Sequence, residues 1–142
     1  NEGSGGAGSR RGGFGVNYKV RLRRGSAKAS MVMDHGRSGP LGALGGENGG
    51  VNRVLIERNG ETYIPPHLSK DQNILIEEGD TIRVSTPGGG GYGNPFQRDP
   101  ELVSRDVHRG YYSSEEAQER FGVVLNQDCS PDVDSTLKIR EP

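Results

Sequence analysis

Apolar and polar residues alternate along most of residues 14–86 with a period of two, which is typical of half-buried β-strands. We expect six short strands, at residues 14–22, 27–33, 51–57, 61–64, 73–77 and 81–86. Turn residues at 24–26, 59–60 and 78–80 predict three antiparallel hairpins between consecutive strands. The pattern predicts a mainly β (α+β) fold with an antiparallel β-sandwich or barrel-like sheet.

The period becomes helical after residue 98, and local signals there predict two short C-terminal helices. Asp99 is a suitable N-cap for the first helix, and Gly110 is placed to end it. Ser113 and Glu116 have the spacing of a capping box that opens the second helix, and Gly122 ends that helix. Residues 123–125 add one further short strand to the prediction.

These patterns divide the chain into three parts. Residues 1–93 form a Gly-rich antiparallel β domain, residues 94–125 a short helical extension packed on it, and residues 126–142 a polar, mobile tail. The Gly- and Ser-rich residues 1–11 are expected to be an exposed lead-in or an arm that docks elsewhere. The first residue is Asn, so we expect a fragment or a processed product.

A glycine run separates the strand-like part of the chain from the helical part. It consists of Gly88, Gly89, Gly90, Gly91, Tyr92 and Gly93. The run satisfies the G-x-G-x-x-G spacing of dinucleotide sites, but Asn94-Pro95 follows it where such a site needs a helix to open directly. Its tyrosine argues against a loose linker. We therefore favour a structural turn region that serves as a Gly-rich contact loop.

Composition limits the size of the core and the class of partner. Only 30% of the residues are apolar and 24 are Gly, so we expect a thin core that leans on a neighbouring part. The net charge of −1 argues against nucleic acid, and we interpret the basic residues at 10–11 and 19–24 as a solvated strand face. No apolar run is long enough for a membrane span. A single cysteine, Cys129, fits a reducing compartment, and we expect a cytoplasmic protein.

Candidate chemistry gathers in the long loop of residues 34–50. Asp34, His35 and Arg37 lie close together there, and a carboxylate, an imidazole and a guanidinium can grip an anion or tune a base. They can equally be solvated turn residues. No pair of the three histidines has metal-site spacing, so we expect no metal site and no catalytic residue that the sequence can name.

Several motifs resemble the C-terminal end of the hydantoinase B family. They are Pro87-Gly-Gly-Gly-Gly-Tyr-Gly-Asn-Pro95, Arg98-Asp-Pro-Glu101, Ser114-Glu-Glu-Ala117 and Phe121-Gly-Val-Val124, with glycine pairs upstream from residue 4. The family includes N-methylhydantoinase B subunits, the matching half of 5-oxoprolinase, and the large subunits of acetone and acetophenone carboxylases. This chain departs from it at Gly39-Pro-Leu-Gly42, where Pro-Pro-Trp-Gly is more common, and at Asn94, where Asp is common.

The resemblance implies a piece of a two-part enzyme. A hydantoinase A-type subunit handles ATP, which drives opening of a cyclic imide or lactam ring. ATP and a divalent metal are implied for the whole enzyme, and the metal ligands associated with the carboxylase members belong to the N-terminal part of the large subunit. This piece would be a scaffold and interface that is inactive alone. Two alternatives stay open, namely the C-terminal part of a ketone carboxylase large subunit and a free-standing β-sandwich binding module.

Overall fold

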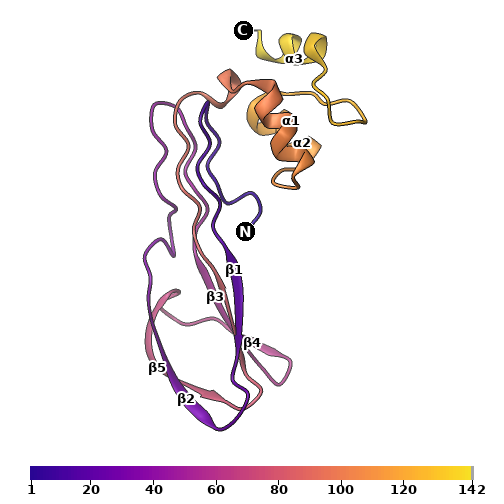
Figure 1. Ribbon diagram of the computed structural model, residues 1–142. Helices are drawn as coiled ribbons and strands as arrows, with labels where there is room; N and C mark the ends of the chain where they lie inside the picture. The colour runs from indigo at the N-terminus through magenta and orange to yellow at the C-terminus, as the bar shows by residue number, and fades with distance from the viewer. Residues whose placement is uncertain (142) are drawn as a thin grey trace.

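The computed structural model describes residues 1–141 and has strands at one end and helices at the other (Figure 1). The strands are β1 (Asn17–Arg21), β2 (Ser26–Val32), β3 (Arg53–Arg58), β4 (Glu61–Tyr63), β5 (Lys70–Glu77) and β6 (Thr81–Ser85). A 3-10 turn, η1 (Pro95–Gln97), leads into α1 (Pro100–His108), α2 (Ser114–Phe121) and α3 (Val133–Arg140). Extended glycine-rich segments join the two ends (Figure 1).

The strands form two antiparallel sheets, so the prediction of a mainly β fold is confirmed. One sheet has the order β1-β6-β3-β4 and the other pairs β2 with β5. In the described residues neither sheet closes into a barrel. Val54, Ile56 and Val84 are buried on one face of the larger sheet, and Ile76 is buried on β5. The sandwich therefore has a small apolar core, as the composition predicts.

Only one of the three predicted hairpins forms. β3 and β4 pair across Asn59 and Gly60, whose φ angles of 50° and 83° suit a tight hairpin turn. The other two hairpin predictions are wrong, because β1 pairs with β6 and β2 pairs with β5. Turn residues determine where the chain reverses. They do not determine whether the next strand pairs with the last one or crosses to the opposite sheet.

Three stretches of extended chain, residues 4–15, 39–50 and 86–93, lie side by side between the sheets and the helices (Figure 1). We call this unit the glycine bundle. Its members bond through backbone groups, as where Gly6 donates to the Gly89 carbonyl and Gly91 to the Glu47 carbonyl, at 2.9 and 2.8 Å. Residues 4–8, expected as an exposed lead-in or an arm that docks elsewhere, are buried within it. The expectation of exposure is wrong for these residues, because they bond to residues 47, 50 and 89, far along the sequence.

Glycine is required in the bundle because the backbones touch. A Cβ atom added to Gly12 would overlap the Gly89 carbonyl oxygen, and one added to Gly91 would overlap the Ala7 carbonyl oxygen. The same reason places Gly at the crowded axis of collagen. The glycine run is thus an extended, packed segment, and of its glycines only Gly93 has a left-handed φ. The expectation of a turn region there is wrong.

The helices pack on the bundle through a second apolar cluster. Its buried members are Ala7, Val103, Tyr112, Ala117, Phe121 and Val123. Asp99 caps α1, and Ser113 and Glu116 form the capping box of α2, as predicted. The predicted strand at residues 123–125 is only an isolated bridge from Leu125 to Pro131. The segment expected as a mobile tail contains α3, which Asp132 caps.

A buried ion triad also fastens the helices to the bundle. Asp106 of α1 accepts from Arg11 of the bundle at 2.7 Å and from Arg98 at 2.9 Å. Burial raises the pKa of the Asp106 carboxyl, but the two guanidinium groups outweigh this and hold the pKa below its ordinary value of 3.8. The guanidinium of Arg11 also lies over the Phe14 ring, 4.5 Å from its centroid.

We predict that Gly12→Ala destabilises the chain, while Gly13→Ala does not. The new methyl group at residue 12 would meet backbone that cannot move aside, at a cost of about 3 kcal/mol. Nothing lies within 4 Å of the position that a Cβ on Gly13 would take. Thermal unfolding should show a midpoint about 10 °C lower for the first variant. Equal midpoints for the two variants would contradict the backbone-contact explanation.

We predict that Asp106→Asn lowers the free energy of unfolding at pH 7 by about 3 kcal/mol, because two largely buried cations lose their carboxylate. Since the folded pKa of Asp106 is depressed, its contribution is complete above about pH 4 and is lost as the pH falls further. Urea titrations should therefore show a wild-type advantage that shrinks below pH 4. Glu119→Gln, on the exposed face of α2, is the control and should show little difference at either pH.

Candidate functional site

Two loops enclose a hollow of about 260 Å³ beside the sandwich. One loop supplies Asp34, His35 and Arg37, the three residues that the sequence selects. The other, which leads into β5, supplies His67, and Lys70 at the start of β5 completes the charged lining. The hollow is also lined by Met33, Gly36, Ser38, Leu68 and Ser69. Five ionisable side chains therefore share one surface depression. Two of them, His67 and Lys70, could not be associated with the other three from their spacing in the sequence.

Buried polar groups hold the two loops in place. The backbone N–H of Asn52 donates to the His35 carbonyl at 2.9 Å, and its side-chain amide donates to the Asp34 carbonyl. On the other side, Ser69 donates from its hydroxyl to the Met33 carbonyl at 3.0 Å, and its own carbonyl accepts from the Met33 N–H at 3.0 Å. Asn52 and Ser69 are each only 2% exposed. They are positioning residues that sequence reasoning missed, because nothing in the local pattern marks them.

Both loops contain a residue in the left-handed region of backbone space. His35 has φ 65° and Leu68 has φ 59°. For a bulky residue such as Leu this conformation is costly, and such residues cluster at functional sites. The two lie on facing walls, where a Cβ on the adjacent Gly36 would approach the Leu68 Cβ to 3.2 Å. The backbone of both walls is therefore held in an uncommon shape around the hollow.

The charged side chains of the hollow, one carboxylate against two cations, favour the binding of an anion. The Asp34 carboxylate lies 2.6 Å from the Lys70 ammonium, and this hydrogen bond lowers the pKa of Asp34. The ring Nδ1 of His35 lies 3.1 Å from the Ser38 carbonyl. Because a carbonyl only accepts, Nδ1 carries the proton and Nε2 is left as a base or ligand atom. Arg37 then adds an exposed cation beside two imidazoles.

The glycine run occupies a different position. Gly88, Gly90 and Gly91 approach backbone of the other bundle segments, and the Tyr92 backbone exchanges hydrogen bonds with Arg10 at 2.8 and 3.0 Å. The Tyr92 side chain is 51% exposed. The contacts seen for the run lie inside this chain, and Tyr92 is the member that presents a large side chain to the outside.

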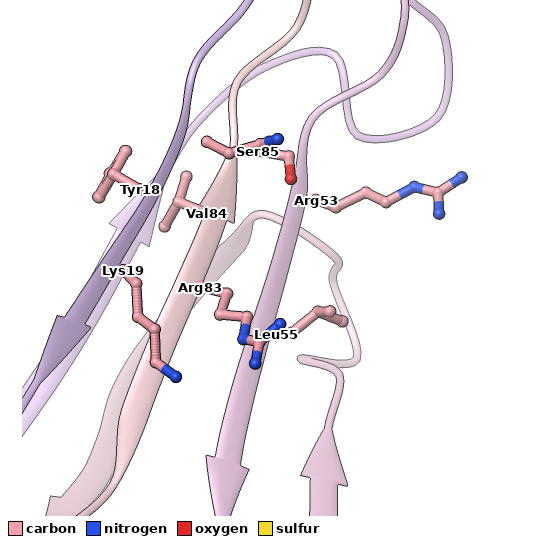
Figure 2. Close-up of a pocket in the computed structure, with 8 residues that line it drawn as sticks. Tyr18, Lys19, Arg53, Leu55, Arg83, Val84 and Ser85 are labelled. Atoms are coloured by element: carbon pink, nitrogen blue, oxygen red, sulfur yellow. The ribbon is translucent and has the colours of Figure 1, made fainter. Parts of the chain in front are cut away.

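A second hollow, of about 360 Å³, lies on the larger sheet (Figure 2). Lys19 of β1, Arg83 of β6 and Arg53 of β3 line it, together with Leu55 and Ser85. Sequence reasoning considered Lys19 within a basic cluster but did not associate it with Arg53 or Arg83. The signal that would have found them is strand register, which brings alternate residues of three strands to one face.

Residues 1–141 bring no three histidine, cysteine, aspartate or glutamate side chains together as metal ligands. In the same residues, no helix has the length and apolar character needed to cross a membrane. His35 and His67 share the first hollow, whereas His108 lies on α1.

Comparison with known proteins gives a family match over two thirds of the chain. The sequence profile described as hydantoinase B/oxoprolinase matches residues 1–95. A protein assigned as the B component of a D-/L-hydantoinase in Pseudomonas sp. (strain NS671) is 32% identical over 131 residues, covering 92% of this chain and 22% of the relative. The beta chain of caprolactamase from Pseudomonas jessenii is 34% identical over 131 residues, covering 87% of this chain and 22% of the relative.

Solved structures agree with the sequence comparison. The crystal structure of ATP-dependent caprolactamase from Pseudomonas jessenii has a TM-score of 0.74 and 26% identity over 98% of this chain and 24% of its own. Nucleotide-free acetone carboxylase has a TM-score of 0.70 over 99% of this chain and 23% of its own, at 18% identity, and so shows likeness of fold alone. The chain spans about a quarter of the length of these proteins.

Proposed function

This chain belongs to the hydantoinase B/oxoprolinase family, and we propose that it works within an ATP-dependent enzyme that opens cyclic amide rings. It corresponds to the C-terminal part of hydantoinase B-type proteins. The observation that carries the proposal is the likeness to ATP-dependent caprolactamase over 98% of the chain at 26% identity. A caprolactam ring and a hydantoin ring both contain the cyclic amide bond that such an enzyme would hydrolyse.

Within the whole enzyme this piece acts as scaffold and interface. The glycine bundle supports this role, because a rigid backbone-to-backbone unit can hold the sandwich and the helices at fixed positions. A hydantoinase A-type subunit supplies ATP handling, and the rest of the B-type chain supplies further catalytic groups. By itself the piece does not turn over substrate. With one cysteine, Cys129, this chain suits the reducing cytoplasm.

The hollow at Asp34, His35 and Arg37 is the part of this chain that we assign to the active-site cleft. Its basic groups fit the carboxylate that ring opening releases, or a phosphate. His35 Nε2 is available to hold or pass a proton. The residues described here do not fit a divalent metal, so no step on this chain is assigned to one.

A second candidate is ATP-dependent ketone carboxylation, which the fold of acetone carboxylase favours. A measurement of ATP hydrolysis separates the two functions. The complete B-type protein, combined with an A-type partner, should hydrolyse ATP faster when a hydantoin, 5-oxoproline or caprolactam is added. Stimulation only by acetone or acetophenone with bicarbonate would instead identify a carboxylase. Substrate turnover by this chain alone would contradict its role as a dependent part.

The next prediction concerns the hollow. In the complete complex, His35→Ala should lower kcat about 100-fold, because a positioned proton carrier contributes on that order. His108→Ala removes an exposed histidine from α1 and is the control. The thermal midpoint of the His35 variant should stay within about 3 °C of wild type, since the ring is exposed. Unchanged kinetics in the His35 variant would show that Asp34, His35 and Arg37 belong to an ordinary solvated loop without a catalytic role.

A further inference from the structure

The larger sheet has one face that is buried over β3 and β6, and one open face. Val54, Ile56 and Val84 are buried on the first face, whereas Tyr18 and Val20 of β1 on that face are 48% and 54% exposed. The opposite face is formed by three cross-strand rows, in which residues of β1, β6 and β3 lie directly opposite one another. The rows are Asn17, Ser85 and Arg53; Lys19, Arg83 and Leu55; and Arg21, Thr81 and Glu57. We call this the open sheet face.

The open sheet face concentrates positive charge. Four of its nine residues are cations, namely Lys19, Arg21, Arg53 and Arg83, and one is an anion, Glu57. The whole chain has a net charge of −1. The face is therefore positive by three charges while the remainder of the chain is negative by four. Lys19 and Arg83 also lie directly opposite each other, an arrangement that is unfavourable unless an anion intervenes.

Glu57 shows how the face accepts a carboxylate. Its two oxygens lie 2.8 Å from Arg83 Nε and 3.6 Å from Lys19 Nζ, so one carboxylate serves two cations. Within residues 1–141, Arg53 makes no ion pair with a carboxylate. Figure 2 shows Arg53 extending outward from β3 near Ser85, at the edge of the 360 Å³ hollow. A second carboxylate placed there would pair with Arg53, and the Ser85 hydroxyl and Asn17 amide would be available as further donors.

The spread of these cations selects the class of ligand. They stand on three neighbouring strands about 4.8 Å apart, so several carboxylates in one chain match them better than one small anion does. Tyr18 lines the hollow, but no aromatic side chain belongs to the rows of this face, so it lacks the series of aromatic side chains on which a single-strand nucleic-acid site stacks successive bases. Exposed Leu, Ile and Phe are absent from the rows apart from the half-buried Leu55, which favours a polar partner over an apolar one.

We propose that the open sheet face docks an acidic polypeptide segment, with a carboxylate of that segment seated in the hollow against Arg53. The segment belongs to another part of the assembled enzyme, since this chain spans about a quarter of its relatives. The docking role is independent of the ring-opening chemistry. It would hold equally in a ketone carboxylase.

Hexaglutamate carrying a fluorophore is the probe, and fluorescence anisotropy with the 142-residue chain is the measurement. The probe should bind, and binding should weaken on raising the salt from about 50 to about 300 mM. Arg53→Glu should raise the Kd about tenfold, because a like charge then faces the probe. Arg53→Gln should give a smaller increase. Circular dichroism confirms that each variant is folded.

Arg105→Glu is the matched control, because Arg105 is exposed on α1, at the other end of the molecule (Figure 1). Its Kd should stay within about twofold of wild type. Three results would overturn the proposal. They are no binding of hexaglutamate, equal weakening by the Arg53 and Arg105 variants, and displacement of the probe by millimolar acetate or phosphate, which indicates a small-anion site. Tighter, Arg53-dependent binding of a single-stranded oligonucleotide would also overturn it, in favour of nucleic acid.

Discussion

Direct contact between backbones in the glycine bundle determines how the rest of this molecule is arranged. Three stretches, residues 4–15, 39–50 and 86–93, approach so closely that a single methyl group would overlap a neighbouring carbonyl at many positions. The sandwich lies at one end of the bundle and the helices at the other (Figure 1). A chain that is only 30% apolar thus gains its rigidity largely from interlocked peptide groups and their hydrogen bonds, with small apolar clusters at each end.

The same arrangement explains where the charged groups matter. The Arg11–Asp106–Arg98 triad joins the bundle to the helices beside the apolar cluster that contains Val103 and Phe121. The hollow around Asp34 and His35 lies where the chain leaves β2, and buried Asn52 fixes its backbone just before β3. The open sheet face is the other polar surface that the fold builds from separate strands. Each of these features depends on residues that are far apart in the sequence.

Local signals in the sequence predicted the local structure well. The capping box of Ser113 and Glu116 and the Asn59-Gly60 turn involve residues within four positions of one another, and both formed as predicted. The pairing of β1 with β6 and the place of His67 beside His35 depend on long-range packing, which alternation and turn residues do not encode. The glycine run was singled out correctly, but its hydrogen-bond partners, at residues 6–13 and 43–47, were not visible from its composition.

The bundle also places a demand on biosynthesis. Residues 4–8 are buried against residues 86–93, so the amino-terminal glycines have no complete set of partners until some 85 further residues have left the ribosome. At ordinary elongation rates of about 5–20 residues per second, that wait lasts several seconds. Meanwhile β1 lacks β6, and both of its edges are open to other chains. Assembly of this fold therefore waits until residue 93 has been made, and chaperone protection of the nascent segment would be most valuable before residue 93 emerges.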